Sequence, residues 1–571
     1  MVALLRSECS MATMLQSPDE PEAPTVRELA DGYVDHLADL SPEVATALGT
    51  RPGDDRVPDL SPDGQAALDD LARATLTALP DARVVDDDDR RCARLLRERL
   101  EAGLAAGAAG EHLRGVRNIN GPHQRVRQLF QLMPTTTADD RATVARRMAK
   151  VPQAFDGWHA ALTEGGRRGL HAAPLQLTTA VAQLDEWLDT RWWHGFVDDP
   201  ADGAALRADL HRAADAAAEA TAALRTRLVE EHLPAADGTP DAVGEERYRL
   251  GARLATGADL DLQEAYAWGW AEFRRLDAQI RAEADRVLPG ASPLQAMAHL
   301  DAHGPAVEGL DEVRGWLQEL LDQAVDELSG HFTIEGPVRR VEAMIAPAGS
   351  AAAPYYTRPS LDFARPGRTW LPTLGETRFP VWNLVSTWYH EGVPGHHLQL
   401  ARWVQLADQL SIYQTTVGSV SATTEGWALY AERLMDELGH LSIPGTRLGY
   451  LDAQQMRAVR VVLDIGMHLR LRVPDDSPQL PGETWTPTVA RAFFAAHCGR
   501  SPAFLDSEIV RYLGWPGQAI SYKLGERAWL AGRDAARAAH GPGFDLTRWH
   551  AKALSLGALG LADLADELAR L

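Results

Sequence analysis

Apolar residues recur at intervals of three and four over much of the chain, beginning with V-R-E-L-A-D-G-Y-V-D-H-L at Val26. This spacing is typical of amphipathic helices. Long helices are also predicted over 204–231, which is rich in alanine, over 262–287, and over 306–328. The chain shows no internal repeat. The pattern therefore predicts a mainly α-helical protein.

The helical pattern stops between residues 346 and 380. Six prolines and three glycines fall in this stretch, which contains P-Y-Y-T-R-P-S and R-P-G-R-T-W. Such a density of proline and glycine is incompatible with a helix and favours short strands joined by ordered loops. The segment is either a structural connector or part of a binding site.

Composition narrows the class of protein. The 571 residues are 45% hydrophobic and 24% charged, as in soluble globular proteins. A formal charge of −23 argues against nucleic acid or an anionic membrane as a partner. The three cysteines form no C-x-x-C pair, which favours a reduced, cytoplasmic setting. The sequence contains no run of 18 apolar residues, so no transmembrane helix is predicted.

The sequence also predicts a domain organisation. Residues 1–25 are acidic and contain prolines, and we expect them to be a disordered tail without a signal peptide. Residues 26–571 are predicted to form a single helical domain, with two lobes over 26–345 and 346–571 as the alternative.

Candidate chemistry is concentrated in T-W-Y-H-E-G-V-P-G-H-H-L-Q-L, residues 387–400. It holds His390 next to Glu391, and then His396 and His397 after a Pro-Gly pair. In the familiar H-E-x-x-H motif, two histidines one turn apart bind zinc and the glutamate acts as general base. Here the second histidine is six or seven residues after His390. On a straight helix it would lie about 9–10 Å further along the axis, too far to share one metal ion with His390.

A single zinc ion can therefore bind both histidines only if the helix is interrupted between them. Pro394 removes a hydrogen bond to the carbonyl of His390, and Gly395 can adopt conformations closed to other residues. The metal hypothesis predicts a kink or bulge here. The alternative is that Pro-Gly simply ends a helix and the histidines are ordinary polar residues. The sequence leaves open whether His396 or His397 is the second ligand.

A third ligand is available in S-A-T-T-E-G-W-A-L-Y-A-E-R, residues 421–433. Thr423 or Thr424 is expected to cap a helix, which places Glu425 in its first turn and Glu432 two turns further on the same face. Glu425 comes 29 residues after His396, which suffices for a helix to end and a second one to return. Glu425 is the predicted third ligand, and a solvated glutamate at a helix start is the alternative.

Three segments of the chain resemble the motifs of a known family. They are H-E-G-V-P-G-H-H-L-Q (390–399), E-G-W-A-L-Y-A-E (425–432) and P-G-Q-A-I-S-Y-K-L-G (516–525). They look like the bacterial family named domain of unknown function 885, and the resemblance covers the chain from about Val26 to Leu571. That family is similar in fold to the carboxypeptidase Taq-type zinc metallopeptidases. The resemblance implies a large multi-helix zinc-peptidase-like fold with a deep central cleft and a small β element near the active site.

Further site residues are proposed in the C-terminal third. Asp464 is the candidate partner for the second nitrogen of a zinc-bound histidine, and His468 is read as a structural histidine. Zinc peptidases need a donor to the oxyanion that forms at the attacked carbonyl. Tyr522 is the preferred candidate for this role, and Arg511 is a possible contact for the oxyanion or for a substrate carboxylate.

The functional hypothesis is a carboxypeptidase- or oligopeptidase-type hydrolase of short peptides or amides. One Zn²⁺ per chain is held by His390, His396 and Glu425, and Glu391 is the general base. An amidohydrolase of a non-peptide metabolite is one alternative. A non-catalytic helical binding protein is the other, and it predicts no convergence of the three ligands. Oligomeric state is not readable from the sequence.

Overall fold

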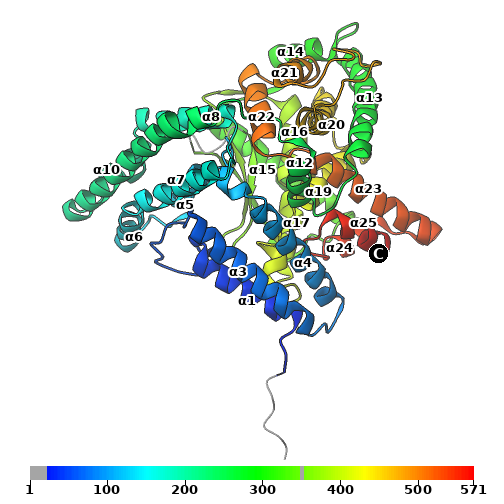
Figure 1. Ribbon diagram of the computed structural model, residues 1–571. Helices are drawn as coiled ribbons and strands as arrows, with labels where there is room; N and C mark the ends of the chain where they lie inside the picture. The colour runs from blue at the N-terminus through cyan, green and yellow to red at the C-terminus, as the bar shows by residue number, and fades with distance from the viewer. Residues whose placement is uncertain (1–21, 348–352) are drawn as a thin grey trace, which may run out of the picture.

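The computed structural model describes residues 22–347 and 353–571 and is mainly α-helical, as predicted (Figure 1). The predicted tail lies outside the described residues up to position 21. Most helices of the N-terminal half, blue to green in Figure 1, lie in the left and lower parts of that view, whereas α12 (Gly244–Thr256) lies near its centre. The helices of this half are α1 (Val26–Leu40), α2 (Pro42–Leu48), α3 (Pro62–Ala78), α4 (Asp87–Ala108), α5 (Pro122–Leu132), α6 (Ala138–Met148), α7 (Val151–Arg167), α8 (Pro174–Asp189), α9 (Trp192–Val197), α10 (Ala204–Arg227), α11 (Leu233–Ala235) and α12 (Gly244–Thr256).

The remaining helices follow from residue 262 onward. They are α13 (Leu262–Val287), α14 (Pro293–His303), α15 (Leu310–Glu327), α16 (Leu384–Glu391), α17 (His396–Gln405), α18 (Ile412–Thr415), α19 (Ser421–Glu437), α20 (Thr446–Leu469), α21 (Pro487–His497), α22 (Pro502–Gly514), α23 (Ser521–His540), α24 (Leu546–Ala553) and α25 (Leu561–Ala569). The helix predicted over 204–231 is confirmed, with α10 continuing as a π-helical turn over Leu228–His232.

Many of these helices begin in the same way, with a serine or threonine cap followed by proline. The cap side chain accepts a hydrogen bond from a backbone N–H of the first turn in α2, α3, α14, α21 and α22. Proline is favourable as the next residue because the backbone N–H at the first helical position has no partner within the helix. A proline there therefore loses no hydrogen bond. The local sequence thus sets these helix starts before any tertiary contact forms.

The residues near 346–380 form two small sheets, as the density of proline and glycine predicts. The first has the order β2 (Val341–Ile345), β4 (Gly367–Leu371), β3 (Tyr355–Thr357), with β2 parallel and β3 antiparallel to β4. The second pairs β1 (Ala306–Glu308) with β5 (Arg378–Pro380). The helix predicted over 306–328 therefore begins only at Leu310, because residues 306–308 pair with a distant strand and Gly309 breaks the chain direction.

Helix α20 lies at the centre of the C-terminal part and is buried on nearly all sides. It packs along α13 and also contacts α12, α16, α21 and α23. A helix buried all round has its backbone groups bonded internally, but its polar side chains need partners. One hydrophobic cluster combines Leu317 with Trp427, on opposite sides of residue 345. The single-domain organisation stays a prediction.

Candidate metal centre

The helix that carries the first histidine ends early, and a new helix begins at the second. Helix α16 ends at Glu391, residues 392–395 leave the helical path, and α17 begins at His396. The Val393–Pro394 peptide bond is cis. The predicted interruption at Pro394-Gly395 is confirmed. It removes the long axial separation that a continuous helix would impose on the two histidines.

Side-chain and backbone contacts fix the path of this break. The Gly395 N–H donates to the Tyr389 carbonyl at 3.0 Å. The indole N–H of Trp427, on α19, donates to the carbonyls of Pro394 at 2.9 Å and Gly395 at 3.1 Å. Because the α19 side chain bonds the turn directly, the helix that supplies Glu425 is locked to the turn that positions His396.

Gly395→Ala tests the close approach at this turn. A Cβ at Gly395 would lie 1.9 Å from the His390 carbonyl oxygen, so the backbone must shift. We expect a loss of stability of about 1–3 kcal/mol, as for overpacking elsewhere, together with weaker metal binding. Gly315→Ala is the matched control, since a Cβ there meets nothing within 4 Å. Chemical denaturation of both variants measures the effect, and equal stabilities would contradict the assigned role.

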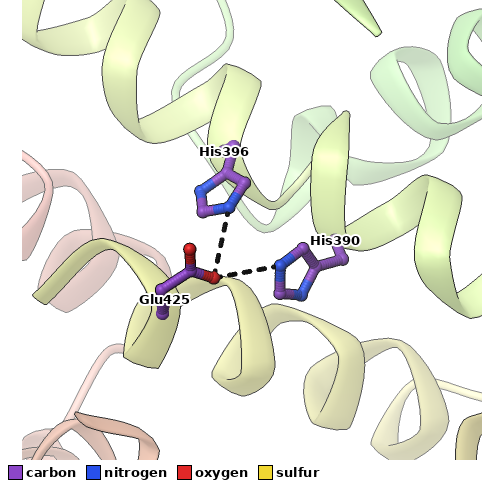
Figure 2. Close-up of side chains that lie close together, drawn as sticks. All are labelled: His390, His396 and Glu425. Atoms are coloured by element: carbon purple, nitrogen blue, oxygen red, sulfur yellow. Dashed lines mark ion pairs between the residues drawn. The ribbon is translucent and has the colours of Figure 1, made fainter. Parts of the chain in front are cut away.

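The kink brings His390 and His396 together with Glu425. The Glu425 Oε2 atom lies 3.3 Å from Nε2 of His390 and 3.6 Å from Nε2 of His396 (Figure 2). One ligand atom from each side chain lies within 4.8 Å of the others. Helix α19 begins at Ser421 and not at the predicted Thr423 or Thr424 cap, so Glu425 lies one turn inside the helix.

These three side chains fit a metal ion. Two atoms bound to one tetrahedral zinc at about 2.0–2.2 Å lie about 3.3–3.5 Å apart, close to the separations seen here. The Oε2 atom of Glu425 is buried and accepts no hydrogen bond from the described residues. Burial disfavours ionisation of Glu425, but both imidazoles oppose it and hold its pKa well below the usual value. A buried carboxylate with this surplus of acceptor capacity is a suitable metal ligand.

Glu432, and not the predicted Asp464, is the partner of His390. The His390 Nδ1 atom lies 2.8 Å from Oε1 of Glu432, which leaves Nε2 available toward Glu425. Burial alone would lower the pKa of His390, but its contacts with Glu425 and Glu432 raise it to about 9. Asp464 instead accepts from the Tyr248 hydroxyl at 2.9 Å and the Gly517 N–H at 3.0 Å. The prediction for Asp464 was wrong.

The predicted base, Glu391, is buried beside the ligands. No hydrogen bond or ion pair involves its carboxylate among the described residues, and the side chain is nearly inaccessible. Burial raises the pKa of Glu391, and the nearby His390 and His396 partly oppose this effect. A carboxylate that is close to the ligands and held by no other group is available to exchange a proton with a bound molecule.

His397 lies on the other side of α17. Its Nε2 is 2.8 Å from the Val338 carbonyl, and its Nδ1 is 2.9 Å from the Tyr356 hydroxyl. Burial lowers the pKa of His397 to about 4, so the ring is neutral. Because both ring nitrogens are engaged there, the side chain that joins His390 and Glu425 is His396. His468 is similarly satisfied, by the Val243 N–H and the Tyr512 carbonyl, as predicted.

The two proposed oxyanion donors occupy different surroundings. Tyr522, near the start of α23, has no hydrogen bond among the described residues, and burial and then the Glu425 charge raise its pKa. Arg511 is buried and committed to other groups: it donates to both carboxylate oxygens of Glu508, at 2.9 and 2.8 Å, and to Gln518. The structure thus leaves Tyr522 available near the ligands, whereas Arg511 belongs to a buried ion-pair cluster.

The small three-stranded sheet packs beside α17. A Cβ at Gly367, on β4, would meet Nδ1 of His397 and the Tyr356 hydroxyl, both at 2.4 Å. The expected β element near the site is therefore present. The predicted cleft at the ligands stays a prediction, because a cavity of about 430 Å³ in the described structure is lined by none of His390, His396 and Glu425.

Comparisons with solved structures agree with the fold. A "putative lipoprotein" from Colwellia psychrerythraea is 21% identical over 96% of this chain and 99% of its own, with a TM-score of 0.80. A "putative lipoprotein of unknown function" from Shewanella oneidensis is 17% identical over 96% and 100% of the two chains, with a TM-score of 0.70. At these identities the likeness concerns the fold alone.

Sequence comparisons identify the family and no activity. No curated protein matches the chain. In the part of the chain that the structure describes, no helix has the length and apolar character needed to cross a lipid bilayer. Residues 42–568 match the family described as "Bacterial protein of unknown function (DUF885)". The match spans nearly the whole chain and agrees with the resemblance of the three motifs. The protein belongs to this DUF885 family.

Proposed function

We propose that the protein is a metal-dependent hydrolase of peptide or amide bonds in short peptides. The observation that carries this proposal is the convergence of His390, His396 and Glu425 beside the buried, unpaired carboxylate of Glu391. Two imidazoles and one carboxylate leave a fourth position for water or substrate, as catalytic zinc sites require. The carboxylates of Glu391, Glu425 and Glu432 also outnumber the nearby guanidinium of Arg457, which favours a divalent cation.

Each side chain has a distinct task in this proposal. His390, His396 and Glu425 would hold the zinc, which supplies Lewis acidity and lowers the pKa of water in the site. Glu391 takes a proton from the attacking water and delivers it to the leaving nitrogen. The Tyr522 hydroxyl donates a hydrogen bond to the oxygen of the attacked carbonyl. Glu432 fixes the ring of His390.

The substrate class follows from the surroundings of α17. A small sheet beside the site offers edge strands that can hold an extended peptide by main-chain hydrogen bonds. We therefore favour short peptides over folded proteins, in a cleft between the helices. Assays with dipeptides and with acylated small molecules separate this activity from that of an amidohydrolase acting on metabolites.

Metal content tests the ligand set. The purified protein is expected to contain about one zinc per chain, measured by elemental mass spectrometry. His396→Gln and Glu425→Ala are expected to lose it. His397→Gln is the matched control, since His397 faces Val338 and Tyr356 and its replacement is expected to retain the metal. Circular dichroism verifies that each variant is folded. Wild-type protein without metal, or equal metal in all variants, would refute the site.

The compartment is part of the proposal. The free, buried thiols of Cys92 and Cys498 agree with the reducing setting expected from cysteine usage, so we propose a cytoplasmic protein. The names of the two solved relatives point instead to an envelope location for those proteins. Fractionation of the producing cells, with detection of the chain by antibody, distinguishes the two.

A further inference from the structure

One cavity of the described structure lies apart from the metal centre. Its volume is about 430 Å³, within the range of small-molecule sites. Its walls come from α2, α3, α4, α5, α7, α8 and α12, from the segment after α4, and from residues 513–516. None of the metal-centre side chains lines it. The cavity is therefore a separate place where a small ligand can be enclosed.

Arg117 lines this cavity without a counter-ion. Its guanidinium carbon lies 5.0 Å from the ring centroid of Trp515, so the plane is supported by an aromatic face. It has no hydrogen bond or ion pair with any residue that the structure describes. Burial, and then the nearby Arg125, lower the pKa of Arg117 to about 10, and Glu111 only partly opposes them. A stacked guanidinium with unused N–H donors is well suited to a carboxylate, which it binds through two parallel hydrogen bonds.

The nearest acidic group cannot serve Arg117 because other arginines already hold it. Glu111 accepts from Arg247 through both carboxylate oxygens, at 2.8 and 2.9 Å, and from Arg114 at 2.7 Å. Arg125 has its own acidic neighbour, Glu43, at 3.7 Å. The cationic groups of the cavity are thus paired within the described protein, with Arg117 as the exception. Arg117 is only partly buried, so its unused N–H groups are accessible to a ligand in the cavity.

Other lining groups also lack partners, among them Gln176 and Asp241. Gln176 is 3% exposed, and its Nε2 donates to the Val510 carbonyl at 2.9 Å, but its Oε1 has no partner among the described residues. The Asp241 carboxylate likewise has no hydrogen bond or ion pair in the described parts of the chain, and burial raises its pKa. The cavity therefore presents an unused cation together with unused acceptors such as Asp241.

We propose that this cavity binds a free amino acid or short peptide as a zwitterion. The ligand carboxylate pairs with the Arg117 guanidinium, and the ligand ammonium donates to the Asp241 carboxylate. The inference rests on the cavity's own residues and does not depend on hydrolysis at the metal centre. It adds a binding site whose ligands share the chemistry of the products that a peptidase releases.

Isothermal titration calorimetry with leucine, leucinamide and N-acetylleucine tests the proposal. Leucine carries both charged groups, leucinamide lacks the carboxylate, and N-acetylleucine lacks the ammonium. Saturable binding of leucine is expected, with at least tenfold weaker binding of leucinamide because Arg117 then has no anion to pair with. Absence of leucine binding by the wild-type protein, or equal affinity for leucinamide, would overturn the proposal.

Variants assign the binding to this cavity. Arg117→Gln is expected to weaken leucine binding at least tenfold. Arg212→Gln, which removes an exposed charge on α10, and His396→Gln, at the metal centre, are expected to leave it unchanged. Loss of binding in His396→Gln but not in Arg117→Gln would place leucine at the metal centre and refute the site. Thermal unfolding of ligand-free Arg117→Gln gives the second measurement. If Arg117 serves ligand binding, the Tm of the variant should equal or exceed that of the wild type. A large decrease in Tm would show that Arg117 has a structural role instead.

Discussion

Glu391→Gln is expected to reduce peptide or amide hydrolysis by about 10²–10⁴-fold, the usual contribution of a positioned acid–base group. Glutamine has nearly the same shape as glutamate but cannot take up a proton. Glu391 lies outside the predicted ligand set, so the metal content of the variant should equal that of the wild type. The proposed activity and the metal site are thereby tested separately in one protein.

The stability of the same variant provides a further criterion. Because Glu391 is buried without a partner, neutralising it removes an unfavourable charge, and Glu391→Gln should unfold at an equal or higher temperature than the wild type. Glu437→Gln is the control, since this carboxylate lies on α19, is 41% exposed and pairs with Arg533. It should retain full activity. Metal-loaded Glu391→Gln with undiminished hydrolysis would exclude Glu391 as the base.

The sequence predicted the helical class and the grouping of His390, His396 and Glu425 because both depend on local patterns. Helix spacing excludes a straight path between His390 and His396, and proline with glycine supplies the break, so a kink followed from geometry. The third member of the group, Glu425, could be anticipated from its place on a returning helix. The choice between His396 and His397 could not, because adjacent residues on a helix start face in different directions, and only the contacts of Val338 and Tyr356 reveal which one is occupied.

The sequence-based predictions were wrong where the partner of a residue comes from a distant segment of the chain. The sequence places Asp464 on a buried helix, but helical spacing does not say which neighbouring helix its side chain meets. In the fold it meets Tyr248, and the carboxylate next to His390 comes from Glu432. Glu432 shares a face with Glu425, seven residues before it, so that spacing was the available signal. The local pattern likewise predicts a helix over residues 306–308, because the strand with which they pair lies some 70 residues further along the chain.

Glu432→Ala is expected to have the largest effect on stability. The carboxylate is fully buried and serves three side chains: it lies 2.8 Å from Nδ1 of His390, accepts from Ser386 at 2.6 Å and pairs with Arg457 at 3.5 Å. Removing one partner of a buried pair typically lowers the free energy of unfolding by about 3–5 kcal/mol, because the other charge is left uncompensated. Here the uncompensated group is Arg457, whose Nε already lacks a partner among the described residues.

Metal affinity should fall as well, by about 10–100-fold, since the loss of a group that orients a ligand histidine usually has this effect. The double variant Glu432→Ala/Arg457→Met separates the two consequences. Removing the unpaired guanidinium should restore part of the stability, whereas His390 still lacks its partner, so metal affinity should stay low. Chelator competition measures the affinity, and urea denaturation measures the stability. If Glu432→Ala bound metal as tightly as the wild type, Glu432 would be a structural residue, and its contact with His390 would have no role in organising the metal centre.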